Sequence, residues 1–221
     1  MARGSPTSDV RKYAVNEKES ITERTARHLQ SLYVVGAGLG VAFALEGMIR
    51  GVGSDPSMEW DTVPVVVAFL VTLIPFFHGA MLYMDTEIRG RATVVMVDFL
   101  ALFSQTVLFF VMAEFVREPT SFVIAWIVLL AVGVAWVLWL MSPMPRDSKR
   151  QDAEPIFREY RSWAIINFIC SLVLLAVYFL VPSGDGRIGP DLRLGLILMV
   201  IAIVRTAADY WFSRAVYFEK P

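Results

Sequence analysis

The sequence lacks the residues on which several classes of protein depend. It has one cysteine, Cys170, so an internal disulfide and a cysteine-based metal site are both excluded. Its 20 Lys and Arg residues are nearly balanced by 21 Asp and Glu, and the net charge of −1 gives no basic surface for nucleic acid. It also holds no Asn-x-Ser/Thr sequon. We therefore expect neither a disulfide scaffold nor a nucleic-acid partner.

Familiar catalytic and cofactor motifs are missing as well. The sequence has no His-Glu-x-x-His and no Gly-x-Ser-x-Gly pattern. Gly36-Ala37-Gly38 resembles the start of a dinucleotide-binding fingerprint, but Val41 stands where the third glycine belongs. A Thr-Val-Gly-Tyr-Gly filter and a voltage-sensing arginine array are also absent. These absences weigh against an enzyme and against voltage-gated channels, and they assign no cofactor.

Hydrophobic residues are abundant and unevenly distributed. They make up 56% of the chain, whereas soluble domains contain about 45–50%. They fall into six blocks of about 20 residues, the length that a membrane-spanning helix needs. We predict an all-α, polytopic integral membrane protein with a six-helix bundle at 30–216. The predicted spans are 30–49, 63–84, 94–115, 121–141, 162–181 and 192–213. Residues 1–29 are predicted as a flexible tail in which a helix starts at Ser20.

Two of the predicted spans have distinctive features. Pro75 lies within the second span, where it is expected to kink the helix and to free a backbone carbonyl for another donor. The fourth span has no charge and contains Trp126, Trp136 and Trp139, which makes it the most lipid-like of the six.

The first span has small residues at every fourth position. Gly36, Gly40 and Ala44 follow the small-xxx-small spacing that lets another helix approach closely. This face is predicted to pack against a helix, either within the chain or in a homo-oligomer. The lipid bilayer is the other expected partner.

The distribution of Lys and Arg predicts the orientation in the membrane. Of the 20 basic residues, 15 lie in the segments on the side of both termini, four lie on the other side, and Arg205 lies within a span. Because cytoplasmic loops carry the excess of positive charge, both termini are predicted to be cytoplasmic. The short loops are typical of a prokaryotic cytoplasmic (inner) membrane protein.

Ionisable and amide residues of four spans fall in the half nearer the predicted cytoplasm: His78, Asp98, Asn167, Arg205 and Asp209. A charge near the bilayer centre costs roughly 2.5–3.5 kcal/mol on insertion scales, so such a residue usually has a partner and often a function. We expect Arg205 to pair with Asp209 or Asp98, and His78 to neighbour one of these carboxylates. The alternative is a buried ion-pair network that only fixes the register of the helices.

Two further carboxylates, Glu46 and Glu114, lie near the predicted outer ends of their spans. They are candidates for an acidic outer mouth that attracts cations. The alternative is a pair of interfacial carboxylates that reach water. His78, Asp85 and Asp98 offer three groups of metal-ligating type, but no known ligand spacing supports a metal site.

Three functions are compatible with these patterns. The first is a small channel or transporter for an ion, a proton or a small anion, with the polar cluster in its pathway. The second is a non-enzymatic accessory, sensor or assembly subunit. The third is a membrane-embedded enzyme acting on a lipid or isoprenoid, in which His78 and Asp98 are acid-base groups and Arg205 binds an anion.

Overall fold

The chain folds into long helices, and a computed structural model describes residues 7–50, 60–86, 95–141, 154–181 and 191–214. No strand occurs in these segments. The elements are α1 (Thr7–Arg50), η1 (Trp60–Thr62), α2 (Val63–Thr86), α3 (Val95–Glu114), η3 (Phe115–Arg117), α4 (Pro119–Met141), α5 (Glu154–Leu180) and α6 (Leu192–Phe212).

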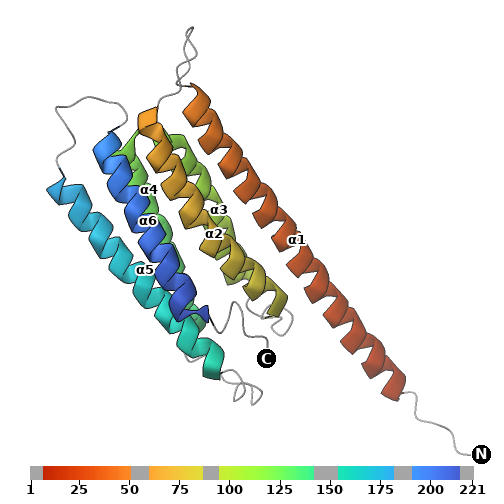
Figure 1. The fold of residues 1–221 in the computed structure, drawn as a ribbon. Coiled ribbons are helices and arrows are strands. Elements are labelled where there is room, and N and C mark those ends of the chain that lie inside the picture. Colours follow the sequence, from red (N-terminus) through yellow and green to blue (C-terminus); the bar gives the residue numbers. More distant parts are fainter. Residues whose placement is uncertain (1–6, 51–59, 87–94, 142–153, 182–190, 215–221) are drawn as a thin grey trace, which may run out of the picture.

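The six long helices form an antiparallel bundle (Figure 1). α1 packs against α2 and α3, α3 against α4, α4 against α5, α5 against α6, and α6 against α2. The helices therefore close into a ring. We call the end at which α1, α3 and α5 begin the base of the bundle, and the opposite end the top.

The outer surface of the bundle suits a bilayer. Five helical segments are long and apolar enough to cross a membrane: Arg27–Ile49, Trp60–Met84, Val97–Arg117, Pro119–Met141 and Tyr160–Leu180. Large apolar side chains such as Val35, Phe179 and Val204 are exposed on the outside, where lipid is the solvent that makes their exposure favourable. The prediction of an all-α membrane protein is thus confirmed. The sixth crossing, by α6 with its buried Arg205 and Asp209, stays a prediction.

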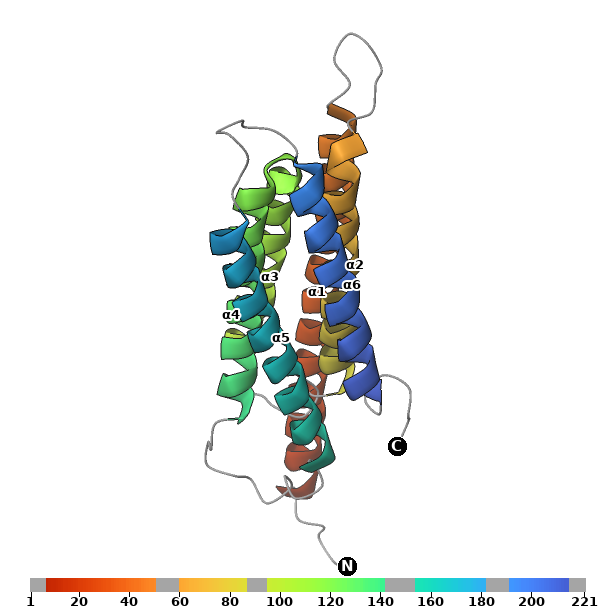
Figure 2. The same ribbon diagram turned by 60° about the vertical axis from the view of Figure 1, so that its left-hand side comes forward.

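Two helices begin earlier than predicted. α1 starts at Thr7, so residues 7–19 are helical rather than a flexible tail, and α1 extends past the base of the bundle (Figures 1 and 2). This stretch has neither Pro nor Gly, so nothing in it breaks a helix. α5 starts at Glu154 rather than 162, because Pro155 lies in its first turn, where proline is tolerated.

The fourth helix is not the lipid-like element that its tryptophans suggested. Trp126 is fully buried, and the indole of Trp136 bonds to Asp98 of α3. Only Trp139 is exposed to the outside. α4 lies between α3 and α5 in the ring, and composition alone does not reveal which sector of such an apolar helix faces its neighbours.

The small-residue face of α1 packs within the chain. A Cβ added at Gly36 would overlap Cγ2 of Thr106 on α3, and one at Gly40 would lie 3.5 Å from Phe109 and Phe69. Ala44 is fully buried. The predicted close helix approach is therefore correct, but the partner is α3 of the same chain. A homo-oligomer through this face stays a prediction.

Because of this close approach, replacing Gly36 and replacing Gly38 of α1 by alanine should have different effects on stability. The hydroxyl of Thr106 donates to the carbonyl of Leu102, which fixes its rotamer, so the methyl group facing Gly36 cannot turn away freely. We expect Gly36→Ala to lower the free energy of unfolding by about 1–3 kcal/mol through overpacking. A Cβ added at Gly38 would have no heavy atom within 4 Å. Gly38→Ala should therefore leave the free energy of unfolding unchanged or raise it by up to about 1 kcal/mol. Unfolding in detergent followed by circular dichroism measures both, and equal effects would contradict this packing.

Candidate functional site

Arg205 is held in the interior of the bundle by a neutral partner. Its Nε and Nη2 donate to Oδ1 of Asn167 on α5, at 3.1 and 2.7 Å, and the residue is only 3% exposed. Its Cζ lies 4.9 Å from the centre of the Phe76 ring on α2. Asn167 in turn donates from Nδ2 to the carbonyl of Trp163. The hydrogen bonds of the Arg205 side chain thus go to the neighbouring helix, and its expected pairing with Asp209 or Asp98 stays a prediction.

The other predicted residues also bond across helices. Oδ1 of Asp98, which is 2% exposed, accepts a hydrogen bond of 3.0 Å from Nε1 of Trp136. Nδ1 of His78 lies 3.1 Å from the hydroxyl of Tyr210, and the expected carboxylate neighbour of His78 stays a prediction. Asp209 is fully buried on α6. The structure thus brings all five predicted residues into the base half of the bundle, which we call the polar layer.

The proline in α2 has the predicted consequence. Pro75 lacks the N–H that would bond to the carbonyl of Val71, four residues earlier. That carbonyl accepts a hydrogen bond of 3.0 Å from Oγ1 of Thr206 on α6. The freed carbonyl therefore joins α2 to α6 beside the polar layer.

This bond can be isolated by a double-mutant cycle. Thr206→Val removes the donor and keeps the shape, and should cost about 1 kcal/mol of stability. Pro75→Ala restores the N–H that bonds Val71 within α2, so in that background Thr206→Val should cost distinctly less. Chemical unfolding of the four proteins gives the coupling energy. Additive effects would show that the two residues act independently.

A small cavity lies on the inner side of the ring at the level of the polar layer. Its volume is about 50 Å³. Residues of α2, α3, α4 and α5 line it, together with Ser213, which follows α6. Five of the lining residues are aromatic: Phe76, Tyr83, Trp136, Tyr160 and Trp163. Phe76 lies against the Arg205 guanidinium, and Trp136 bonds to Asp98, so two residues of the cavity wall contact charged side chains of the layer.

Three buried polar groups at this level have hydrogen-bonding capacity that is not used within the described segments. Gln105 accepts a bond from the Tyr33 hydroxyl at Oε1, but its Nε2 has no hydrogen-bond partner. The hydroxyl of Ser213 and Nη1 of Arg205 also have none. Gln105 and Ser213 are 1% and 4% exposed, and both line the cavity. Unsatisfied buried polar groups are costly and therefore call for an explanation.

The sequence pointed to some residues of the site and missed others. Gln105 follows Asp98 by seven residues, on the same face of α3, so its spacing was a usable signal. Trp136, Trp163 and Phe76 gave none, because aromatic residues are common in membrane helices and their direction depends on how each helix is rotated.

The two outer carboxylates do not belong to this site. Glu46 and Glu114 are exposed near the top of α1 and α3. Glu114 lines a shallow hollow with Phe43 and Phe110, and Glu46 is not part of that lining. The shared acidic mouth stays a prediction. Within the segments described, no group of three His, Cys, Asp or Glu residues is placed to hold a metal ion, and the side chain of Asp85 lies outside the described residues.

Together, these features define a class: an α-helical integral membrane protein with buried charges around a small internal cavity. No protein-family model, curated protein or solved structure matches this chain.

Proposed function

We propose that this protein is a small channel or transporter that passes an ion, a proton or a small anion along the cavity of the polar layer. The observation that supports it is the coincidence of three buried ionisable residues with a cavity inside the helix ring. Arg205, Asp98 and Asp209 are each no more than 3% exposed. Charged residues inside membrane proteins are costly and typically mark ion or substrate pathways.

The size of the cavity favours small cargo. Sites for drug-sized ligands occupy about 300–1,000 Å³, whereas this cavity has about 50 Å³. A water molecule needs roughly 10–15 Å³ of such space, so the cavity fits a few waters or one small ion. This volume does not favour an enzyme that encloses the head group of a lipid or isoprenoid.

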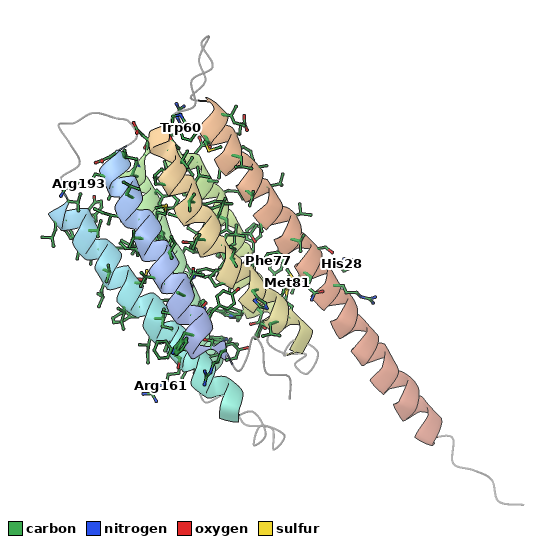
Figure 3. The ribbon with its side chains drawn as sticks, in the orientation of Figure 1. His28, Trp60, Phe77, Met81, Arg161 and Arg193 are labelled. Carbon is green, nitrogen blue, oxygen red and sulfur yellow. The ribbon has the colours of Figure 1, made fainter. Side chains whose placement is uncertain are left out.

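The proposal includes the membrane topology. Six spans with both termini in the cytoplasm would place the base of the bundle, and with it the polar layer, on the cytoplasmic side. The distribution of basic residues supports this arrangement. Arg161 belongs to the side with 15 basic residues and Arg193 to the side with four. The two arginines lie at opposite ends of the bundle (Figure 3). The short loops support a prokaryotic inner membrane.

An accessory or assembly subunit is the second candidate, and one observation favours it. Arg205 bonds to Asn167, Asp98 to Trp136, and His78 lies against Tyr210. Such cross-helix pairs also fix the register of helices in a protein that transports nothing. The two candidates differ in whether the purified chain alone supports flux.

Reconstitution of the purified protein in liposomes tests the proposal. Wild-type protein should raise the flux of protons or of a small ion above that of protein-free vesicles. Asp98→Asn keeps an acceptor for Trp136 but removes a charge, and should change the flux at least about tenfold, as expected for a pathway charge. Glu118→Gln changes a carboxylate at the top of the bundle, which accepts from Ser121, and should leave it unchanged. Wild-type vesicles no more permeable than protein-free ones would refute the function.

A further inference from the structure

We infer that the cavity is a binding site for a small monovalent anion of halide size. This inference rests on the proposed function and specifies its cargo. It is drawn from the kind of polar groups that the polar layer leaves available, from the size of the cavity and from the charge behind its wall.

Three polar groups at this site are able to donate hydrogen bonds that the structure does not use. Nε2 of Gln105 and Nη1 of Arg205 are N–H groups that only donate, and the hydroxyl of Ser213 is able to donate. Gln105 and Ser213 come from different elements, α3 and the end of α6, and both face the same cavity. Donors that converge from separate helices suit a ligand that only accepts hydrogen bonds, and a halide is such a ligand.

Arg205 supplies the positive charge. Its guanidinium lies against Phe76, a wall residue of the cavity, and its partners in that position are an amide oxygen and an aromatic ring. Neither neutralises it. In a medium of low dielectric constant a fixed cation attracts an anion more strongly than it does in water.

The lining residues and the volume of the cavity further restrict which anions it is able to bind. Aromatic rings carry a positive edge, which tolerates an anion in contact with it. A divalent metal cation such as Ca²⁺ takes six to eight oxygen ligands, and the lining is mostly aromatic and aliphatic. About 50 Å³ accommodates a single halide with little water, whereas the larger, divalent sulfate is disfavoured.

The negatively charged carboxylates of the polar layer weaken the binding of an anion, so removing one of them distinguishes an anion site from a cation site. Asp98 bonds to Trp136, a wall residue of the cavity, and Asp209 lies one turn before Ser213 on α6. If an anion occupies the cavity, removing a negative charge beside it should tighten binding. Asp209→Asn is therefore expected to bind halide more tightly than the wild type, whereas a cation site would respond in the opposite sense.

Quenching of tryptophan fluorescence by iodide provides the test, on the full chain purified in detergent. Trp136 and Trp163 line the cavity, whereas Trp60 and Trp211 are exposed. Bound iodide should add a saturable component to the linear quenching of the exposed indoles. Chloride should reverse that component, and sulfate at equal ionic strength should not. Strictly linear quenching of the wild type, or reversal by sulfate as well as by chloride, would overturn the inference.

Variants connect the saturable component to the donors. Gln105→Leu and Ser213→Ala should each weaken iodide affinity about tenfold, as expected for the loss of a hydrogen bond to a charged group. Ser213→Ala is small enough to preserve the fold if Gln105→Leu does not. Ser121→Ala, at the top of the bundle, is the matched control and should bind like the wild type. Unchanged affinity in Ser213→Ala and in a folded Gln105→Leu would overturn the inference.

This experiment also separates the inference from the function on which it rests. Saturable halide binding without flux in liposomes would keep the site and refute the transporter. Flux of protons or cations without saturable halide binding would keep the transporter and overturn the anion site.

Discussion

Asn167→Leu is expected to lower the free energy of unfolding by about 3 kcal/mol or more, because a buried donor that loses its acceptor costs about 1–3 kcal/mol and a charged donor costs more. Asn167 is fully buried and its carboxamide oxygen accepts both hydrogen bonds that the Arg205 side chain makes in the structure. Leucine has nearly the same volume but no acceptor, so the guanidinium would remain buried against Phe76 without that oxygen. Unfolding of the detergent-solubilised protein, followed by circular dichroism, measures the loss.

A double variant of Asn167 and Arg205 tests whether the loss of stability arises from their hydrogen bonds, and a variant of the neighbouring residue serves as the control. Replacing both residues, as Asn167→Leu with Arg205→Met, removes the buried cation together with its acceptor and should recover most of the lost stability. Phe168→Leu changes the next residue, which faces outward, and should alter stability by no more than about 0.5 kcal/mol. A double variant as unstable as Asn167→Leu alone would show that the amide does not act through Arg205.

Ala80→Phe is expected to reduce ion flux at least about tenfold while the bundle remains folded. Ala80 is buried and lines the cavity, and a phenyl ring fills more space than about 50 Å³ offers. Overpacking of this kind typically costs about 1–3 kcal/mol, so unfolding must be measured beside flux to show that the protein survives.

The control for Ala80→Phe is the same change on the outer surface. Ala176 lies on α5 and is exposed on the outside of the ring, so Ala176→Phe adds the same ring to the lipid-facing side. Its flux should match the wild type. If folded Ala80→Phe conducts as well as Ala176→Phe, the pathway does not use the cavity.

The sequence was sufficient to predict the helices and the residues of the polar layer, because both depend on local patterns. Apolar runs of spanning length predicted the position of every long helix. Pro75 predicted a free backbone carbonyl in α2, and the hydroxyl of Thr206 donates a hydrogen bond to that carbonyl. Charged residues in apolar runs are rare enough to be recognised individually. Errors at the ends of α1 and α5 arose where polar residues continue a helix beyond the apolar run.

The partners of these residues were not predictable, because they depend on how each helix is rotated in the ring. The spacing from Arg205 to Asp209 shows that the two share a face, but not which neighbour that face meets. Packing decides this: Gly133 lets Trp163 and Phe76 approach α4, which brings α5 and its Asn167 to their place. The small residues of α1 predicted a close contact in the same way without specifying α3.

The most direct test of ion passage through this cavity is the block of flux in Ala80→Cys by methyl methanethiosulfonate, a small neutral reagent that attaches a methylthio group to a cysteine thiolate. The native thiol, Cys170, is first replaced by alanine. Flux through Ala80→Cys should fall when the reagent is added, and flux through Ala176→Cys should not. If the reagent leaves the flux through Ala80→Cys unchanged, that result would contradict a pathway through the polar layer and leave its buried charges with a structural role.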